Sequence, residues 1–214
     1  MNIPNKQPAQ PIKLHGFDLS GHSHRVTLFL SLLQLPYISI QVDLANKAHK
    51  HTDFLAMNPF GQVPVIEDGA ITLADSNAIL VYLAKQYGPD HWLPQDAIGA
   101  AKIAQWLGVA AGLVAYGPAA ARLITVFKYP LNAEEVIARA HNLFVLMDTL
   151  LEKTPFLIGS TPTIADIANY TYIAHAPEGN VALDAYPNLC AWLQRIEALP
   201  YFVPMAKTAI GLAA

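Results

Sequence analysis

The sequence predicts a small α/β domain followed by an all-helical domain, with the boundary near residue 90. Strand-like and helix-like runs alternate up to residue 87, whereas no convincing strand follows residue 96. Between the two parts, Gly88–Gln95 (GPDHWLPQ) contains two prolines and a glycine, which is typical of a linker. We therefore assign residues 1–11 to a flexible leader, 12–88 to the α/β domain, 89–96 to the linker and 97–214 to the helical domain.

The first domain begins with a β-α-β pattern. Ile12–Phe17 is a short strand candidate, and Arg25–Leu35 has the length of a helix. That helix should end before Pro36, because a proline disfavours helical geometry in the residue before it. Tyr37–Leu44 (YISIQVDL) alternates in part and is rich in β-branched residues, which favours a second strand.

A hairpin and a second helix complete the predicted sheet domain. Val63–Ile66 and Ile71–Leu73 are short apolar runs joined by EDGA, and an acidic residue followed by glycine favours a tight turn. In Ser76–Tyr87, apolar residues at 79, 80, 83 and 87 share one helix face. The resulting order of elements predicts a small mixed sheet covered by helices.

The second domain contains only helix-like runs: Ala97–Tyr116, Ala133–Lys153, Ile164–Ala176 and Leu189–Leu199. Thr163–Asp166 has the pattern of a capping box, so Asp166 is expected at a structural helix start. Ile103–Ala121 carries no charge and is nearly long enough to span a bilayer. Its Gln105 and its Gly117-Pro118 pair, which should break or kink a helix, favour a buried helix instead.

The composition excludes several classes of protein. Charged residues make up 14% of the chain and apolar residues 53%, which is typical of a globular protein. A formal net charge of −3 provides no electrostatic basis for binding nucleic acid or an anionic membrane. The single cysteine, Cys190, excludes an internal disulfide and a thiolate zinc site, and it fits a cytoplasmic location. The N-terminus has no signal-peptide pattern.

Two His-x-His pairs raise the possibility of a metal site. On a helix, His22 and His24 would point in different directions and could not share one ion. His49 and His51 could do so in a loop, but no third ligand follows at a usual spacing. We therefore predict no metal.

The segment Asp18–Val26 (DLSGHSHRV) also places serines beside histidines. Ser20 does not lie in a Gly-x-Ser-x-Gly elbow, and closeness in sequence does not make a catalytic triad. Ser20 or Ser23 would instead be the N-cap of the following helix, which contributes about 1 kcal/mol.

A further segment, Asn58–Ser76 (NPFGQVPVIEDGAITLADS), offers groups that could hold an extended ligand. The Val63-Pro64 bond, at a strand start, is a place where a cis peptide could turn the backbone of Val63 outward for pairing with an added strand. Asp75 and Ser76 begin a helix, whose N-terminal N–H groups and positive dipole end favour a carboxylate.

This segment resembles the glutathione-binding region of cytosolic glutathione transferases. The matching pieces are Asn58–Pro64 (NPFGQVP), Glu67–Gly69 (EDG) and Asp75–Ile79 (DSNAI), with Thr163–Asp166 at the expected distance. The resemblance covers the chain from about Ile12 to the last helix. It implies a thioredoxin-like domain followed by an all-helical domain, glutathione as co-substrate and a homodimer.

The resemblance also implies roles for individual residues. Val63 would hold the cysteinyl backbone of glutathione, with Pro64 in cis, and Asp75 and Ser76 would bind the γ-glutamyl end. The residues that would meet the glycyl carboxylate are His49, Lys50 and Gln62. Asp75 is shorter than the more usual Glu or Gln.

The catalytic residue follows from the class of transferase. No tyrosine precedes Tyr37 and no cysteine precedes Cys190, so the chain is similar to serine-type bacterial members of the phi, zeta or theta kind. Ser20 lies six residues before Val26, at the spacing of the serine in phi- and zeta-type enzymes, and Ser23 is the second candidate. His22 takes the place of a cysteine in zeta-type enzymes, and we hypothesise that it tunes the site.

The implied reaction is conjugation of the glutathione thiolate, stabilised by Ser20, to small electrophilic, mostly apolar substrates. The expected second-substrate pocket lies between the loop after the first strand and the first long helix of the second domain, with Phe17, Leu19, Tyr116, Arg122 and Phe127 as candidates. Two alternatives remain open at this point: glutathione-dependent cis-trans isomerisation, and a non-catalytic relative that serves as a protein-interaction module.

Overall fold

The computed structural model describes residues 6–214, which form two compact units. The first unit extends to Leu93 and includes Pro200–Met205, and the second comprises Pro94–Leu199 and Ala206–Ala214. Residues 1–5 of the predicted leader lie outside the described residues, and residues 6–11 contain no helix or strand. The expected helical domain therefore differs in one respect, because Pro200–Met205 packs with the first unit: the Tyr201 and Val203 carbonyls accept hydrogen bonds from Ser31 and His24.

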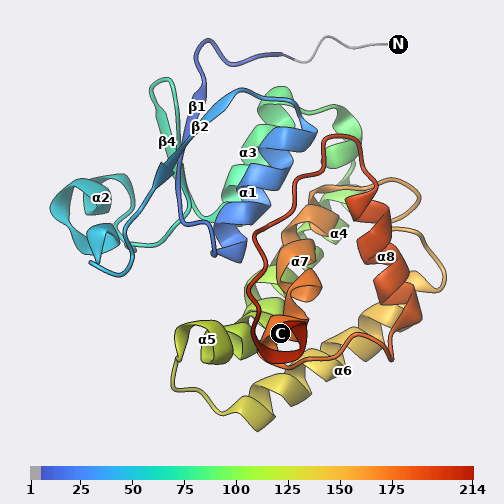
Figure 1. Ribbon diagram of the computed structural model, residues 1–214. Helices are drawn as coiled ribbons and strands as arrows, with labels where there is room; N and C mark the ends of the chain where they lie inside the picture. Colours follow the sequence, from blue (N-terminus) through green and yellow to red (C-terminus); the bar gives the residue numbers. More distant parts are fainter. Residues whose placement is uncertain (1–5) are drawn as a thin grey trace. The chain divides into compact units, whose positions relative to one another are not determined.

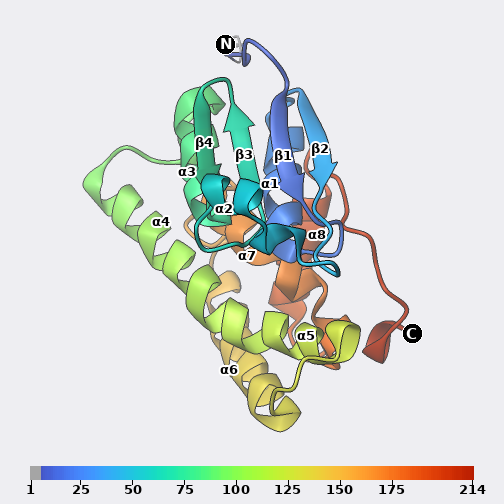
Figure 2. The ribbon, with the colours of Figure 1, turned by 90° about the vertical axis from the view of Figure 1, so that its left-hand side faces the viewer.

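The first unit is a four-stranded mixed sheet with the strand order β2-β1-β3-β4, as Figure 2 shows. Its elements in chain order are β1 (Ile12–Gly16), α1 (Gly21–Leu32), β2 (Tyr37–Gln41), η1 (Ala48–Lys50), α2 (Thr52–Met57), β3 (Val65–Asp68), β4 (Ile71–Ala74), α3 (Ser76–Tyr87) and η2 (Asp90–Trp92). Strand β1 pairs parallel with β2 and antiparallel with β3, which in turn pairs antiparallel with β4. This is the predicted thioredoxin-like arrangement.

Helices α1 and α3 cover one face of the sheet, and α2 lies on the other (Figure 1). The first face holds the main core, in which side chains from α1, α3, β1 and β3 are almost fully buried: Ile12, Leu14, Val26, Leu28, Phe29, Leu30, Ile66, Ile79, Leu80 and Leu83. Phe54 of α2 packs into a smaller cluster with Val42 and Val65 on the other side. Helix α2 was not predicted from the sequence, because six residues are too few to show helical periodicity.

Helix α1 begins at Gly21, four residues before the predicted run Arg25–Leu35, and its N-cap is Ser20, the first of the two predicted caps. The first five residues, Gly21–Arg25 (GHSHR), include no apolar side chain and so carry no apolar periodicity, yet Ser23, His24 and Arg25 are buried through contacts elsewhere in the unit. Helix α3, in contrast, spans the predicted residues, with Asp75 as N-cap and Gly88 as C-cap.

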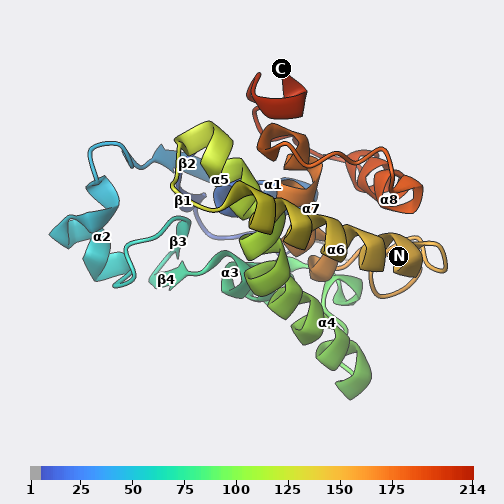
Figure 3. The same ribbon diagram turned by 90° about the horizontal axis from the view of Figure 1, so that it is seen from below.

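The second unit is helical throughout. Its elements are α4 (Ala97–Val109), the π-helix η3 (Ala110–Ala119), α5 (Ala120–Phe127), α6 (Ala133–Leu151), α7 (Ile164–Ala174), η4 (Ala176–Gly179), α8 (Pro187–Glu197) and η5 (Gly211–Ala213). Helix α7 is buried over Ile164–Ile173 and contacts both α4 and α8; the helices of this unit are seen from below in Figure 3. The predicted capping box at its start is confirmed, and the buried Asp166 carboxylate also accepts from the Leu157 N–H and the Trp192 indole.

Of the expected break or kink at Gly117-Pro118, a break does not occur, because α4, η3 and α5 follow one another without a gap. The chain accommodates Pro118 within a π-helical stretch, a device that relieves the loss of one backbone donor. Gly117 is required for packing: a Cβ there would lie 3.2 Å from the backbone N and Cα of Ala140 on α6. Ala97–Phe127 is long and apolar enough to cross a membrane by length and composition alone, but 44% of its most apolar window is buried, and core helices of soluble proteins pass the same test.

Candidate functional site

The strand register brings three predicted site segments to one edge of the sheet. His15 of β1 lies opposite Val65 of β3, and Val65 lies opposite Ala74 of β4. Strand β3 is antiparallel to both neighbours, so the chain leaving β1, the chain entering β3 and the chain leaving β4 share that edge. These are the segments that carry Ser20, Val63-Pro64 and Asp75-Ser76.

Of the two candidate serines, only Ser20 keeps an accessible position. It is half-buried at the N-cap of α1, where its Oγ accepts the Ser23 N–H at 3.2 Å. Ser23 is 4% exposed, and its Oγ accepts the Phe17 N–H at 3.1 Å. The Ser20 hydroxyl proton is free of this capping bond, because the capping oxygen only accepts.

The Val63-Pro64 peptide bond is cis, as predicted. Asn58, which is buried, stabilises the preceding loop: its amide donates to the Gln62 carbonyl at 2.8 Å and its Oδ1 accepts the Phe60 N–H at 3.1 Å. Val63 is half-buried at the end of this loop, whereas the Gln62 side chain is exposed.

His49 and Lys50 lie beside the same loop, in η1. The Lys50 ammonium donates to the carbonyls of Phe60 (3.2 Å) and Gly61 (2.8 Å). Gly61 has a positive φ of 58°, and a Cβ there would lie 2.7 Å from the His49 carbonyl oxygen, so only glycine fits. The buried Nδ1 of His49 has no hydrogen-bond partner, and burial, followed by the charge of Lys50, lowers the pKa of its ring. This loop therefore offers an ammonium and an imidazole at one end of the edge.

Asp75 and Ser76 lie at the same edge of the sheet, in the chain that leaves β4. Asp75 has φ 68° and ψ 120°, a strained conformation for a residue with a side chain, and strain of this kind clusters at functional sites. Its Oδ1 accepts the N–H groups of Asn77 (2.9 Å) and Ala78 (3.0 Å), so the carboxylate caps α3 while the residue remains exposed. A carboxylate beside a helix N-terminus can take a ligand ammonium on Asp75 and a ligand carboxylate on the helix end.

Arg25 connects the N-terminal part of α1 to the first turn of α3, a role that was not predicted from the sequence. It is 1% exposed, and its Nη1 donates to Ser76 Oγ at 2.7 Å and to Asn77 Oδ1 at 2.8 Å. His22 Nδ1 lies 3.3 Å from the same Ser76 oxygen. The sequence gives no local sign of these contacts, which join residues more than fifty positions apart.

The two histidines of DLSGHSHRV have different partners, which accords with their spacing on a helix. His22 faces Ser76, and His24 Nε2 lies 2.9 Å from the Val203 carbonyl oxygen. Within residues 6–214, no three His, Cys, Asp or Glu side chains come together in a group that could hold a metal ion.

The residues expected around a second substrate belong to both units. In the first unit, Phe17 and Leu19 are half-buried in the loop between β1 and α1. In the second, Tyr116 is 65% exposed and lines a surface hollow of about 520 Å³ with residues of α4, η3 and α6. Phe127 is 40% exposed, and the Arg122 guanidinium carbon lies 5.8 Å from the centre of its ring.

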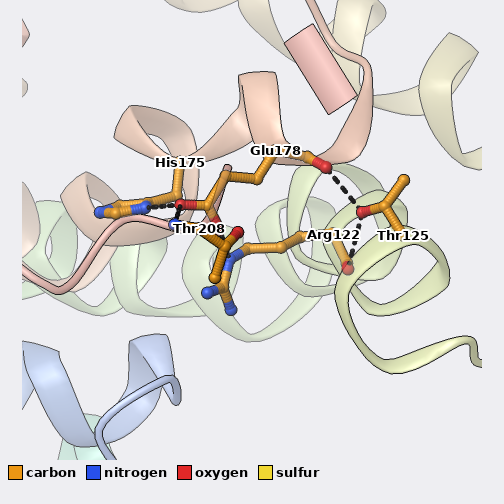
Figure 4. A network of polar contacts seen from close by, with 5 residues as sticks. All are labelled: Arg122, Thr125, His175, Glu178 and Thr208. Carbon is orange, nitrogen blue, oxygen red and sulfur yellow. Dashed lines mark hydrogen bonds and ion pairs between the residues drawn. The ribbon is translucent and has the colours of Figure 1, made fainter. Parts of the chain in front are cut away.

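Arg122 has a different place from the one expected of a pocket residue. It is 2% exposed and its Nε donates to Glu178 Oε2 at 2.6 Å, in the network drawn in Figure 4. His175 Nδ1 (2.7 Å) and the Thr208 N–H (3.0 Å) meet the other oxygen of Glu178. Burial would raise the pKa of Glu178, but these hydrogen bonds and the Arg122 charge outweigh it and lower the pKa to about 2. Arg122 is therefore an internal residue of the helical unit and not a residue that lines a pocket.

Both units match the family indicated by the motifs. Residues 19–86 match the model of the glutathione S-transferase N-terminal domain, and residues 105–200 match that of the C-terminal domain. Glutathione S-transferase 3 of Zea mays is 34% identical over 207 residues, which cover 90% of this chain and 91% of the relative. The chain belongs to the glutathione S-transferase family. Within it the chain is theta- or phi-like, since glutathione S-transferase theta-1 of Mus musculus is 32% identical over 84% of this chain and 80% of the relative.

Solved glutathione S-transferase structures agree with the fold. A glutathione S-transferase from Pseudomonas fluorescens superimposes with a TM-score of 0.86 at 33% identity, covering 92% of this chain and all of the other. A glutathione transferase homolog from Drosophila mojavensis, solved with bound glutathione, has a TM-score of 0.81 at 31% identity and 89% coverage of each chain. The predicted fold class and enzyme class are thus confirmed.

Proposed function

We propose that this transferase conjugates the thiolate of glutathione to small electrophilic, mostly apolar substrates, and that Ser20 stabilises the thiolate. The observation that carries the proposal is the position of Ser20: it is the N-cap of α1, at the sheet edge shared with the cis Val63-Pro64 bond. Lowering a thiol pKa of about 8.5 by roughly 2 units requires about 3 kcal/mol. A hydrogen bond from Ser20 and the positive end of α1 together are of this size.

The tripeptide would lie along that edge. Val63 pairs with the cysteinyl backbone through its main chain, while Asp75 and Ser76 bind the γ-glutamyl end. His49, Lys50 and Gln62 meet the glycyl carboxylate, which suits the positive charge of that loop. Because Asp75 already caps α3 through Oδ1, its Oδ2 is the oxygen for the ligand ammonium.

We further propose that the protein is a cytoplasmic homodimer and that Phe17 and Leu19, in the loop after β1, contact the second substrate. Arg122 is left out of the second-substrate pocket because Glu178 holds it in the interior of the helical unit. The accessible position of Ser20 favours thiolate chemistry over a role as a protein-interaction module. A zeta-like isomerase would use the same thiolate, so only the substrate separates it from the proposed transferase.

The test is a conjugation assay with glutathione and an electrophilic aromatic halide, on wild type, Ser20→Ala and Ser20→Gly. Both variants should lose about 10- to 100-fold in kcat/KM, since a hydrogen bond to a charged group contributes about 1.5 to 3 kcal/mol. Glycine retains most of the capping stability, so Ser20→Gly separates the hydroxyl from the cap. Ser23→Ala is the matched control at the second serine; a loss there, with Ser20→Gly unaffected, would reject the assignment.

A further inference from the structure

The hydroxyl of Ser76 is approached by two side chains of α1. Arg25 Nη1 lies 2.7 Å from Ser76 Oγ, and His22 Nδ1 lies 3.3 Å from it. Ser76 itself is 3% exposed at the first residue of α3. All three residues belong to the first unit. The pair of His22 and Ser76 does not activate a nucleophile, because the proposed thiol lies at Ser20 and not at Ser76.

A serine hydroxyl has one proton to donate and two lone pairs to accept with. A guanidinium only donates, so Arg25 occupies one lone pair of Ser76. A ligand carboxylate only accepts, so it can bind the Ser76 hydroxyl only by taking its proton in a hydrogen bond. His22 must then donate to the second lone pair, because no proton of Ser76 remains for it.

His22 is a neutral imidazole at physiological pH. Burial and the nearby Arg25 charge lower its pKa to about 3, and the Asp75 carboxylate opposes them only in part. A neutral imidazole has one N–H, on either Nδ1 or Nε2, and the hydrogen bonds around the ring decide which. The state of Ser76 and the tautomer of His22 are therefore linked.

We propose that His22 is a positioning residue for the γ-glutamyl carboxylate of glutathione, donating Nδ1–H to Ser76 Oγ so that the hydroxyl proton of Ser76 faces the ligand. In the absence of a carboxylate, the hydroxyl donates to His22 Nδ1 and the ring carries its proton on Nε2. Ligand binding reverses this bond, and the ring exchanges protons with solvent with no net change in charge. The inference rests on the proposed function, since it concerns the same glutathione site.

The test compares two ligands by calorimetry: glutathione, and 4-aminobutyryl-cysteinyl-glycine, which lacks only the γ-glutamyl carboxylate. His22→Ala should weaken glutathione binding about five- to tenfold, the usual effect of one neutral hydrogen bond, and leave the affinity for the analogue unchanged. His22→Asn should recover most of the loss, because its amide nitrogen can donate from a position close to that of Nδ1. His51→Ala is the matched control, as His51 is exposed and makes no capping hydrogen bond.

Spectra of ¹⁵N-histidine-labelled wild type provide a second readout that a merely structural role would not move. Adding glutathione should shift His22 to the Nδ1–H tautomer. An equal loss for both ligands in His22→Ala, or an unchanged tautomer on binding, would overturn the inference while wild-type glutathione binding upholds the proposed function. Wild type that binds no glutathione would overturn the proposed function and this inference with it.

Discussion

Each unit contains a buried arginine, and the two are used differently. Arg122, in the helical unit, meets the carboxylate of Glu178, to which a histidine and a backbone N–H also donate. Arg25, in the sheet unit, donates to two neutral oxygens, those of Ser76 and Asn77. The first cluster is closed around an internal anion. The second, which we call the open cluster, consists of Arg25, Ser76 and Asn77, and its positive potential is directed toward the Ser76 hydroxyl at the start of α3, where an anionic ligand can bind.

Because of this difference, we expect the largest loss of stability when a residue of the closed cluster is substituted. Glu178→Gln should lower the free energy of unfolding by about 3 to 5 kcal/mol, because it leaves the Arg122 charge buried without its anion. Urea denaturation measures the loss. A loss no larger than that of a surface pair would show that the helical unit does not depend on this cluster.

The open cluster should respond more in binding than in stability. Ser76→Ala removes one acceptor of Arg25, but Asn77 keeps another, so we expect a stability loss of about 1 to 2 kcal/mol. Glutathione affinity should fall about tenfold in calorimetry. If Ser76→Ala destabilises the protein as much as Glu178→Gln does, the two clusters have the same role and the comparison fails.

Acid should weaken the closed cluster in a defined pH window. The pKa of Glu178 is lowered to about 2, and burial lowers the pKa of His175 despite the nearby carboxylate, with Arg122 and Lys207 adding to the lowering. Groups with depressed pKa values stabilise the fold above their usual pKa, so stability should fall as pH drops below about 6.5 for His175 and below about 4.5 for Glu178. Each group costs at most about 1.4 kcal/mol per pH unit.

Thermal unfolding between pH 7 and pH 3 measures this dependence. A fall of roughly 3 to 6 °C per titrating group and pH unit is expected for a chain of this size. Glu178→Gln should flatten the curve below pH 4.5, because the titrating carboxyl is gone. A curve unchanged by the substitution would place the acid sensitivity elsewhere.

The smallest effect is expected at the surface. Glu135 and Arg139 form an exposed pair one turn apart on α6. Glu135→Gln should change the unfolding free energy by less than about 0.5 kcal/mol, because water screens the pair. Glu135→Gln, measured in the same urea denaturation, is the control for Glu178→Gln. A loss above about 1 kcal/mol for Glu135→Gln would mean that burial does not explain the difference between the two carboxylates.

Local signals in the sequence were sufficient to predict elements whose ends carry capping or turn residues. Helix α3 has a capping aspartate and a following glycine, and both of its bounds were predicted. The hairpin also followed from a short pattern, whereas the cis Val63-Pro64 bond was implied by the resemblance to glutathione transferases. The start of helix α1 was predicted four residues late, because its first turn is buried by tertiary contacts and not by an apolar stripe.

Features that depend on distant contacts were missed. Arg25 meets Ser76 across 51 positions, and Arg122 meets Glu178 across 56, so no spacing rule connects them. Arg122 was predicted at a substrate pocket from its position after the first long helix of the second domain, and its partner Glu178 was not foreseen. The π-helical stretch around Pro118 was also not predicted.

The most direct measurement of the central claim is calorimetric titration of the wild-type protein with glutathione, next to Ser76→Ala. The account predicts saturable binding, with one site per chain, and an affinity about tenfold weaker in the variant. Equal affinities would remove Ser76 from the ligand site, and no binding to the wild type would contradict the glutathione site as a whole.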